Sequence, residues 1–108
     1  MSEAVKIIRE EIEKRGIKVI KIILFGSRAK GTYKEDSDWD FFVIIDKVLP
    51  FKEKREILGS IYKKLAQNID ESFEILIVSE KEFEESKKYI GTLSYEVDKE
   101  GVNYQKIG

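Results

Sequence analysis

Three mostly apolar runs, rich in β-branched and aromatic residues, predict buried β-strands along the chain. They are Val19–Phe25, Trp39–Ile45 and Phe73–Val78. The first two are separated by a polar loop alone, which permits antiparallel pairing but does not prove it.

Helical spacing characterises the segment before the first run, where the apolar positions are Val5, Ile8 and Ile12. We expect Ser2 to cap this helix and Gly16 to end it. Pro50 fits the first position of a second helix. The predicted buried stripe of that helix consists of Phe51, Ile57, Leu58, Ile61, Tyr62 and Leu65.

Two more helical segments follow the third apolar run. Ser79 and Glu82 have the spacing of a capping box and open a helix that continues to about Tyr89. Thr92–Glu100 predicts a last helix, followed by a short extension from Val102 to Tyr104. This order of elements predicts a small sheet with helices packed over it, an α+β fold.

Composition limits the size of the fold and its location. Apolar residues make up 42% of the 108 residues and are spread evenly, so we expect a single domain over residues 1–108. No apolar run approaches 18 residues, so no membrane association is expected. The N-terminus lacks the apolar core of a secretory signal, which indicates a cytoplasmic protein.

The side-chain inventory restricts the possible chemistry. The chain has no cysteine and no histidine, so a reaction would depend on carboxylates, hydroxyls, backbone amides, cations and a metal. Lys and Arg total 20 against 21 Asp and Glu. Without a basic excess, direct binding of DNA or RNA is not expected.

The polar loop after the first strand begins with Gly26-Ser-Arg-Ala-Lys-Gly31, which superficially resembles a Walker phosphate loop. That motif requires lysine directly after its second glycine, where this chain has Thr32. It also requires a helix to begin there, whereas the following residues are polar and lead into a strand. A P-loop ATPase is therefore excluded as an interpretation.

Asp38 and Asp40 stand two residues apart at the start of the second strand, so both carboxylates point to one face. Same-side positions lie roughly 6.5–7 Å apart at Cα, close enough to share a divalent ion. The alternative is an Asx turn at residues 36–38, with Asp40 as a strand-end charge.

Gly26 and Ser27 end the preceding strand and can form an anion-binding turn, because glycine leaves the backbone amides uncovered. Arg28 and Lys30 add positive charge. A simple Gly-Ser turn is the alternative. If the two strands are neighbours, this turn and the aspartates lie at the same end of the sheet.

Glu74 is a third candidate, because it is a charge inside the otherwise apolar third strand. Burying a carboxylate there is costly unless it is paired or bound to a metal. It can also be an edge or strand-end charge that meets solvent. Asp70 and Glu71 are nearby alternatives that precede the apolar run.

These residues together resemble the signature of the DNA polymerase β-like nucleotidyltransferase superfamily. The matching elements are Leu24-Phe25-Gly26-Ser27, ten intervening residues, Asp38-Trp39-Asp40-Phe41, and Phe73-Glu74-Ile75. The fuller Gly26–Gly31 string, Ser37–Asp40 and the ending Asp98–Tyr104 resemble the minimal nucleotidyltransferase (MNT) family.

The resemblance implies a compact α+β domain with a mixed sheet that binds ATP and Mg²⁺, with two metal ions. It places Gly26 and Ser27 at the triphosphate and Asp38 and Asp40 at the metals, with Glu74 where the family more often has aspartate. Lys30 stands where the family usually has arginine; with Arg28 it is expected to help bind the nucleotide.

The same resemblance implies an antitoxin that transfers AMP from ATP to a hydroxyl, most specifically a tyrosine, of a HEPN-domain toxin. Larger members carry extra domains for the acceptor, so we expect the acceptor surface here to come from a partner. The competing interpretation is an antitoxin with a weak or inactive site that neutralises its toxin by binding alone. A third interpretation, a transferase acting on RNA or a small molecule, is disfavoured for RNA by the missing basic surface.

Overall fold

The computed structural model describes residues 1–103 and contains a four-stranded sheet in the order β3-β2-β1-β4. The strands are β1 (Val19–Phe25), β2 (Trp39–Ile45), β3 (Phe73–Ser79) and β4 (Val102–Asn103). β1 pairs with β2 and β4 antiparallel, whereas β2 and β3 are parallel. The predicted α+β fold is confirmed, and Tyr104 lies outside the described residues.

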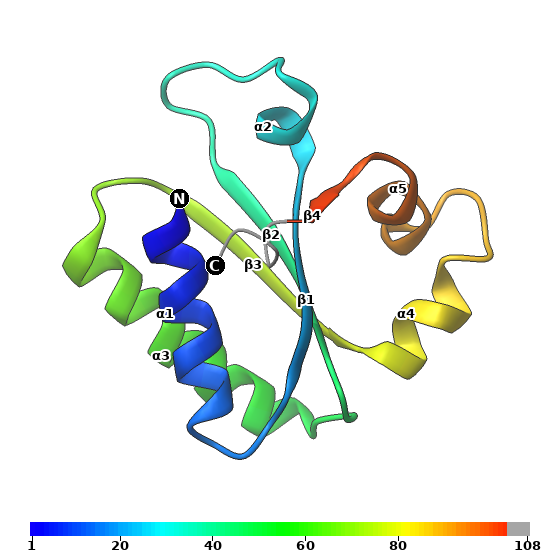
Figure 1. Ribbon diagram of the computed structural model, residues 1–108, viewed down its shortest axis with the longest axis horizontal. Coiled ribbons are helices and arrows are strands. Elements are labelled where there is room, and N and C mark those ends of the chain that lie inside the picture. Colours follow the sequence, from blue (N-terminus) through cyan, green and yellow to red (C-terminus); the bar gives the residue numbers. More distant parts are fainter. Residues whose placement is uncertain (104–108) are drawn as a thin grey trace.

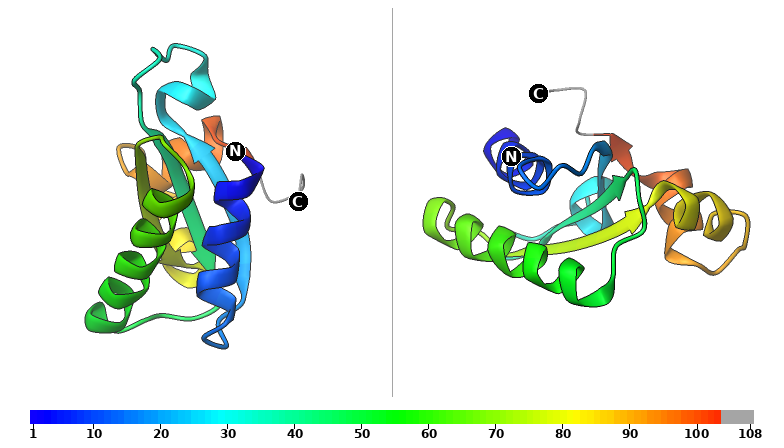
Figure 2. Two further views of the ribbon diagram at one scale, coloured as in Figure 1. Left: turned by 90° about the vertical axis from the view of Figure 1, so that its left-hand side faces the viewer. Right: turned by 90° about the horizontal axis from the view of Figure 1, so that it is seen from below.

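The helices are α1 (Ser2–Glu13), α2 (Gly26–Lys30), α3 (Phe51–Asn68), α4 (Glu80–Ser86) and α5 (Leu93–Glu100). α1 and α3 pack side by side, while α4 and α5 are grouped apart from them (Figures 1 and 2). α2 and the loop that follows it project beyond one end of the sheet, at the top of Figure 1. Within residues 1–103, no helix combines the length and apolar character needed to cross a membrane.

Each face of the sheet has its own apolar cluster, because side chains alternate along the strands. The larger cluster lies under α1 and α3 and includes Ile8, Phe41 and Ile61. The smaller cluster contains Phe42 together with Phe83 of α4 and other side chains of α5 and the strands. Several apolar strand residues on this second face are only partly buried, so α4 and α5 cover it incompletely.

α1 and α3 also share a buried carboxylate. The side chain of Glu11 is only 3% exposed and forms ion pairs with Lys14, Arg15 and Lys64. Ser60 of α3 donates a hydrogen bond to it over 2.6 Å. The Ser60 hydroxyl first, and then Lys14 and Lys64, lower the pKa of Glu11 to about 2 even though burial acts in the opposite direction.

The edge strand β3 is held by a side chain of α3. The backbone N–H of Ile75 donates to the hydroxyl of Tyr62 over 2.7 Å. Tyr62 is therefore a structural partner of the strand that carries Glu74.

Several sequence-based boundaries need correction. Ser2 is the first residue of α1 rather than its cap, and no side chain caps that helix. Pro50 is the cap of α3, which begins at Phe51. α4 ends at Ser86, before Tyr89, although its capping box is present as predicted.

The predicted stripe of α3 is only partly buried. Ile57, Ile61 and Leu65 are fully buried, whereas Phe51 is 74% exposed. Phe51 lies seven residues before Leu58, so the two share the flank of the helix rather than its buried centre.

Candidate metal and nucleotide site

The end of β1 and the starts of β2 and β3 meet at one end of the sheet. Asp40, the second residue of β2, pairs with Phe25 on one side and with Glu74 on the other. Alternation along β2 places the side chain of Asp40 on the face of Phe42, opposite α1 and α3. Asp38 precedes β2 by one residue.

The structure brings the three carboxylates together. Oxygens of Asp38, Asp40 and Glu74 all lie within 4.8 Å of one another. Asp38 and Glu74 are exposed and Asp40 is half-buried, so the cluster opens to solvent. The alternatives Asp70 and Glu71 are exposed residues that precede β3 and do not belong to this cluster.

Electrostatics at the cluster favour a cation. Burial is the largest cause that raises the pKa of Asp40, to about 6. The negative charge of Glu74, a hydrogen bond with it and the charge of Asp38 act in the same direction. Three oxygen ligands with uncompensated charge suit a hard divalent ion such as Mg²⁺, so the residues fit the metal that the sequence predicts.

Gly26 is in direct contact with this cluster. Its φ is +73°, and a Cβ built on it would lie 2.2 Å from Asp40 Oδ2. Glycine is thus required both by the left-handed backbone and by the close approach of the carboxylate. Gly26, the first residue of α2, therefore lies beside Asp40, and the Gly26-Ser27 turn and the aspartates are at the same end of the sheet, as expected if the strands are neighbours.

The helix α2 at Gly26–Lys30 was not expected from the sequence. The five residues have no apolar periodicity, and the helix ends at Gly31, whose φ is +78°. A Walker loop would need a helix that begins at its second glycine, Gly31. Residues 31–38 form a loop instead, as expected.

Arg28 and Lys30 have partners other than the carboxylate cluster. The guanidinium of Arg28 contacts the loop of residues 31–38 and the ring of Trp39. Lys30 forms ion pairs with Glu96 at 3.1 Å and Glu100 at 3.3 Å, which raise the pKa of Lys30. Both glutamates belong to α5, so Lys30 connects α2 to that helix. A role for either cation in nucleotide binding stays a prediction.

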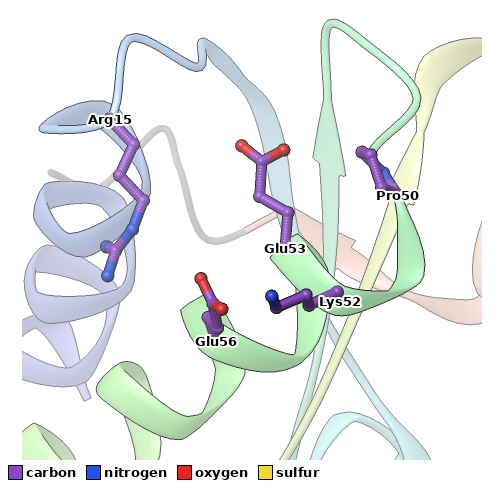
Figure 3. A pocket seen from close by; sticks show the side chains of 5 residues that line it. All are labelled: Arg15, Pro50, Lys52, Glu53 and Glu56. Carbon is purple, nitrogen blue, oxygen red and sulfur yellow. The ribbon is translucent and has the colours of Figure 1, made fainter.

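A shallow hollow lies at the opposite end of β2, beside the start of α3. Arg15, Pro50, Lys52, Glu53 and Glu56 line it (Figure 3). Its charges are mixed, and it is separated from the carboxylates by the length of β2, roughly 20 Å for a seven-residue strand. It contributes nothing to the candidate site.

The arrangement defines a class of protein. Residues 6–100 match the family described as "Polymerase beta, Nucleotidyltransferase". Because the match covers most of the chain, the protein belongs to this nucleotidyltransferase family, and the predicted superfamily is confirmed.

Part of the chain is also similar in sequence to a named archaeal protein. A protein of Methanocaldococcus jannaschii named "Putative protein adenylyltransferase" is 37% identical over 60 residues. The matched region is 56% of this chain and 56% of the relative, so the chain spans only about half the length of that protein.

Solved structures confirm the fold. A toxin–antitoxin crystallised with AMP-PNP is 23% identical, with a TM-score of 0.62. A mutant of the toxin–antitoxin MntA–HpeT is 21% identical, with a TM-score of 0.63. Each match covers 98% of this chain and 75% of the other. At this identity the likeness establishes fold and not function.

Proposed function

We propose that the protein transfers AMP from ATP to a hydroxyl of a partner protein in a Mg²⁺-dependent reaction. The observation that carries this proposal is the convergence of Asp38, Asp40 and Glu74 within 4.8 Å, directly beside Gly26. Membership of the nucleotidyltransferase family and the adenylyltransferase name of the archaeal relative support it.

In this proposal the three carboxylates would bind two Mg²⁺ ions. Bound Mg²⁺ would neutralise charge at the α-phosphate and acidify the acceptor hydroxyl. Gly26 and Ser27 contact the triphosphate and orient it toward the carboxylates. The acceptor oxygen bonds to the α-phosphorus, pyrophosphate leaves with the electron pair, and the hydroxyl proton passes to a carboxylate or to solvent. No histidine is needed, and the chain contains none.

We further propose that the acceptor is a tyrosine of a HEPN-domain toxin and that both proteins are cytoplasmic. The support is the resemblance to the MNT family and the presence of toxin–antitoxin complexes among proteins of the same fold. The incomplete cover of the sheet face that carries the carboxylates leaves room for a partner to approach.

The test is labelling of a co-purified HEPN protein with AMP from radiolabelled ATP. We expect Asp38→Asn and Asp40→Asn to abolish labelling, because each removes a charge from the cluster. Asp36→Asn is the matched control, since Asp36 is an exposed aspartate of the same loop outside the cluster.

Glu74→Gln tests the third carboxylate, with Glu71→Gln as its control. Unchanged metal binding and turnover in Glu74→Gln would show that Glu74 is not a ligand. If wild type and the aspartate variants give the same background labelling while all of them still silence the toxin, the proposed AMP transfer is contradicted. That result would support an antitoxin that acts by binding alone.

A further inference from the structure

The guanidinium of Arg28 is enclosed by the loop that leads to the aspartates. Its Cζ lies 4.4 Å from the ring centroid of Tyr33 and 4.5 Å from that of Trp39. Its Nε and Nη2 donate to the carbonyl of Ser37 over 3.3 and 3.1 Å, and Nη2 also donates to the carbonyl of Glu35 over 3.2 Å.

These contacts involve the residues on both sides of Asp38. Ser37 precedes Asp38 and gives its carbonyl to Arg28, while Trp39 follows Asp38 and packs its ring against the guanidinium. The buried indole nitrogen of Trp39 has no hydrogen-bond partner among the described residues. Trp39 therefore contributes its ring to this contact rather than its N–H group.

The loop needs such a contact because it has little internal structure. Its other hydrogen bonds include Ser37 N–H to the Lys34 carbonyl at 3.1 Å and Lys34 N–H to the Ser37 hydroxyl at 2.8 Å. The loop itself is mostly exposed and polar. Its return to the sheet is held at Trp39, which packs against the apolar cluster under α1 and α3 and donates its backbone N–H to the Ser72 carbonyl over 2.9 Å. Arg28 joins the start of this loop, at α2, to its end, at β2.

We propose that Arg28 is a positioning residue that fixes Asp38 beside Asp40 for metal binding, rather than a ligand of the triphosphate. One edge of the guanidinium is engaged by carbonyls and two aromatic rings contact it, so a phosphate would compete with these contacts. Lysine cannot replace it, because it lacks the planar fork that donates in one direction while stacking in another. The link to metal binding rests on the function proposed above.

The experiment compares Arg28→Lys and Arg28→Gln with wild type in three measurements. Amide hydrogen exchange of residues 32–38 reports on the loop, and the emission of Trp39, the single tryptophan, reports on its contact with Arg28. The dissociation constant for Mn²⁺ reports on the carboxylates. We expect exchange to accelerate about tenfold, the emission to shift, and Mn²⁺ to bind about tenfold more weakly.

Arg55→Gln is the matched control, because Arg55 lies over the ring of Phe51, at 5.9 Å, on α3. It should leave all three measurements unchanged. Tyr33→Leu is the milder variant should Arg28 variants fold poorly; Tyr33 is 51% exposed, so its loss removes one ring contact without opening the core. We expect smaller changes in the same directions.

A different result would overturn the proposal. If Arg28→Gln raises the KM for ATP while loop exchange and Trp39 emission stay at wild-type values, Arg28 is a phosphate ligand. A positioning role instead lowers kcat with little change in KM. If wild type labels no partner, the proposed transfer fails, but loop exchange and Trp39 emission still decide the role of Arg28.

Discussion

Replacement of Gly26 by alanine should damage the site far more than the fold. The new Cβ would lie 2.2 Å from Asp40 Oδ2 and 3.2 Å from its Cγ. The carboxylate must therefore retreat by more than about 1 Å to reach an ordinary van der Waals separation. Because Asp40 is the half-buried member of the carboxylate cluster, this movement changes the geometry offered to the metal.

The structure sets the size of both effects. Alanine at φ +73° carries a left-handed strain of about 1–2 kcal/mol, which lowers the melting temperature by about 4–8 °C per kcal/mol. A displacement of about 1 Å in a reacting constellation costs roughly 100-fold in rate. We therefore expect a folded protein with AMP transfer reduced about 100-fold and clearly weaker Mn²⁺ binding.

Gly31→Ala is the control that separates strain from displacement. Gly31 has φ +78°, nearly the same as Gly26, but a Cβ there has no atom within 4 Å. Both variants should lose similar stability in thermal unfolding. Only Gly26→Ala should lose Mn²⁺ affinity, measured by calorimetry, and AMP transfer.

Equal Mn²⁺ affinity and equal transfer in the two variants would refute this reasoning. It would mean that the contact between Gly26 and Asp40 is not needed at the site, and that the glycine serves the backbone alone.

Other predictions concern charge. Because the pKa of Asp40 is raised to about 6, protons compete with the metal below that pH, and the rise in melting temperature that Mn²⁺ gives at neutral pH should vanish by about pH 5. In the metal-free protein, the same raised pKa means that protonated Asp40 stabilises the fold at acid pH. This contribution is lost as the pH rises through 6. Glu11→Gln should lower the free energy of unfolding at pH 7 by about 1–3 kcal/mol without altering AMP transfer. The control Glu10→Gln should leave the free energy of unfolding unchanged. The folded pKa of Glu11 is about 2, so this difference should persist above pH 4.5 and disappear as pH falls toward 2, in urea titrations at several pH values. Lys30→Ala should leave the melting temperature nearly unchanged, because the ion pairs of Lys30 are half-exposed. The same variant should raise the KM for ATP if Lys30 binds the triphosphate. An unchanged KM would show that Lys30 serves only to connect α2 to α5.

The strands and the carboxylates could be predicted because each depends on a local pattern. β1 and β2 have the predicted bounds, since continuous apolar runs end at glycine or begin at charge. Asp40 and Glu74 are neighbours in register across parallel strands, and a period of two places both on the face that the carboxylates share.

Contacts that depend on the path of a loop or on a distant helix could not be predicted. From the sequence, Arg28 was expected only to add positive charge near the nucleotide. The neighbouring residues in the sequence do not reveal that the rings of Tyr33 and Trp39 contact its guanidinium. Lys30 meets a glutamate 66 residues away, Glu96, whose position depends on how α5 packs. Periodicity likewise assigned Phe51 to the buried stripe of α3, whereas the side chain of Phe51 is 74% exposed at the start of that helix.

The hydrogen bond from Ile75 to Tyr62 has a consequence for association. β3 is an edge of the sheet, and exposed edges recruit strands from other chains and lead to aggregation. The hydroxyl of Tyr62 occupies one outward N–H in the third residue of β3, so an incoming strand would find a side chain where it needs a carbonyl partner. A strand from another chain would therefore have to displace the Tyr62 hydroxyl before it could pair with β3 at Ile75, which protects this edge of the sheet against aggregation.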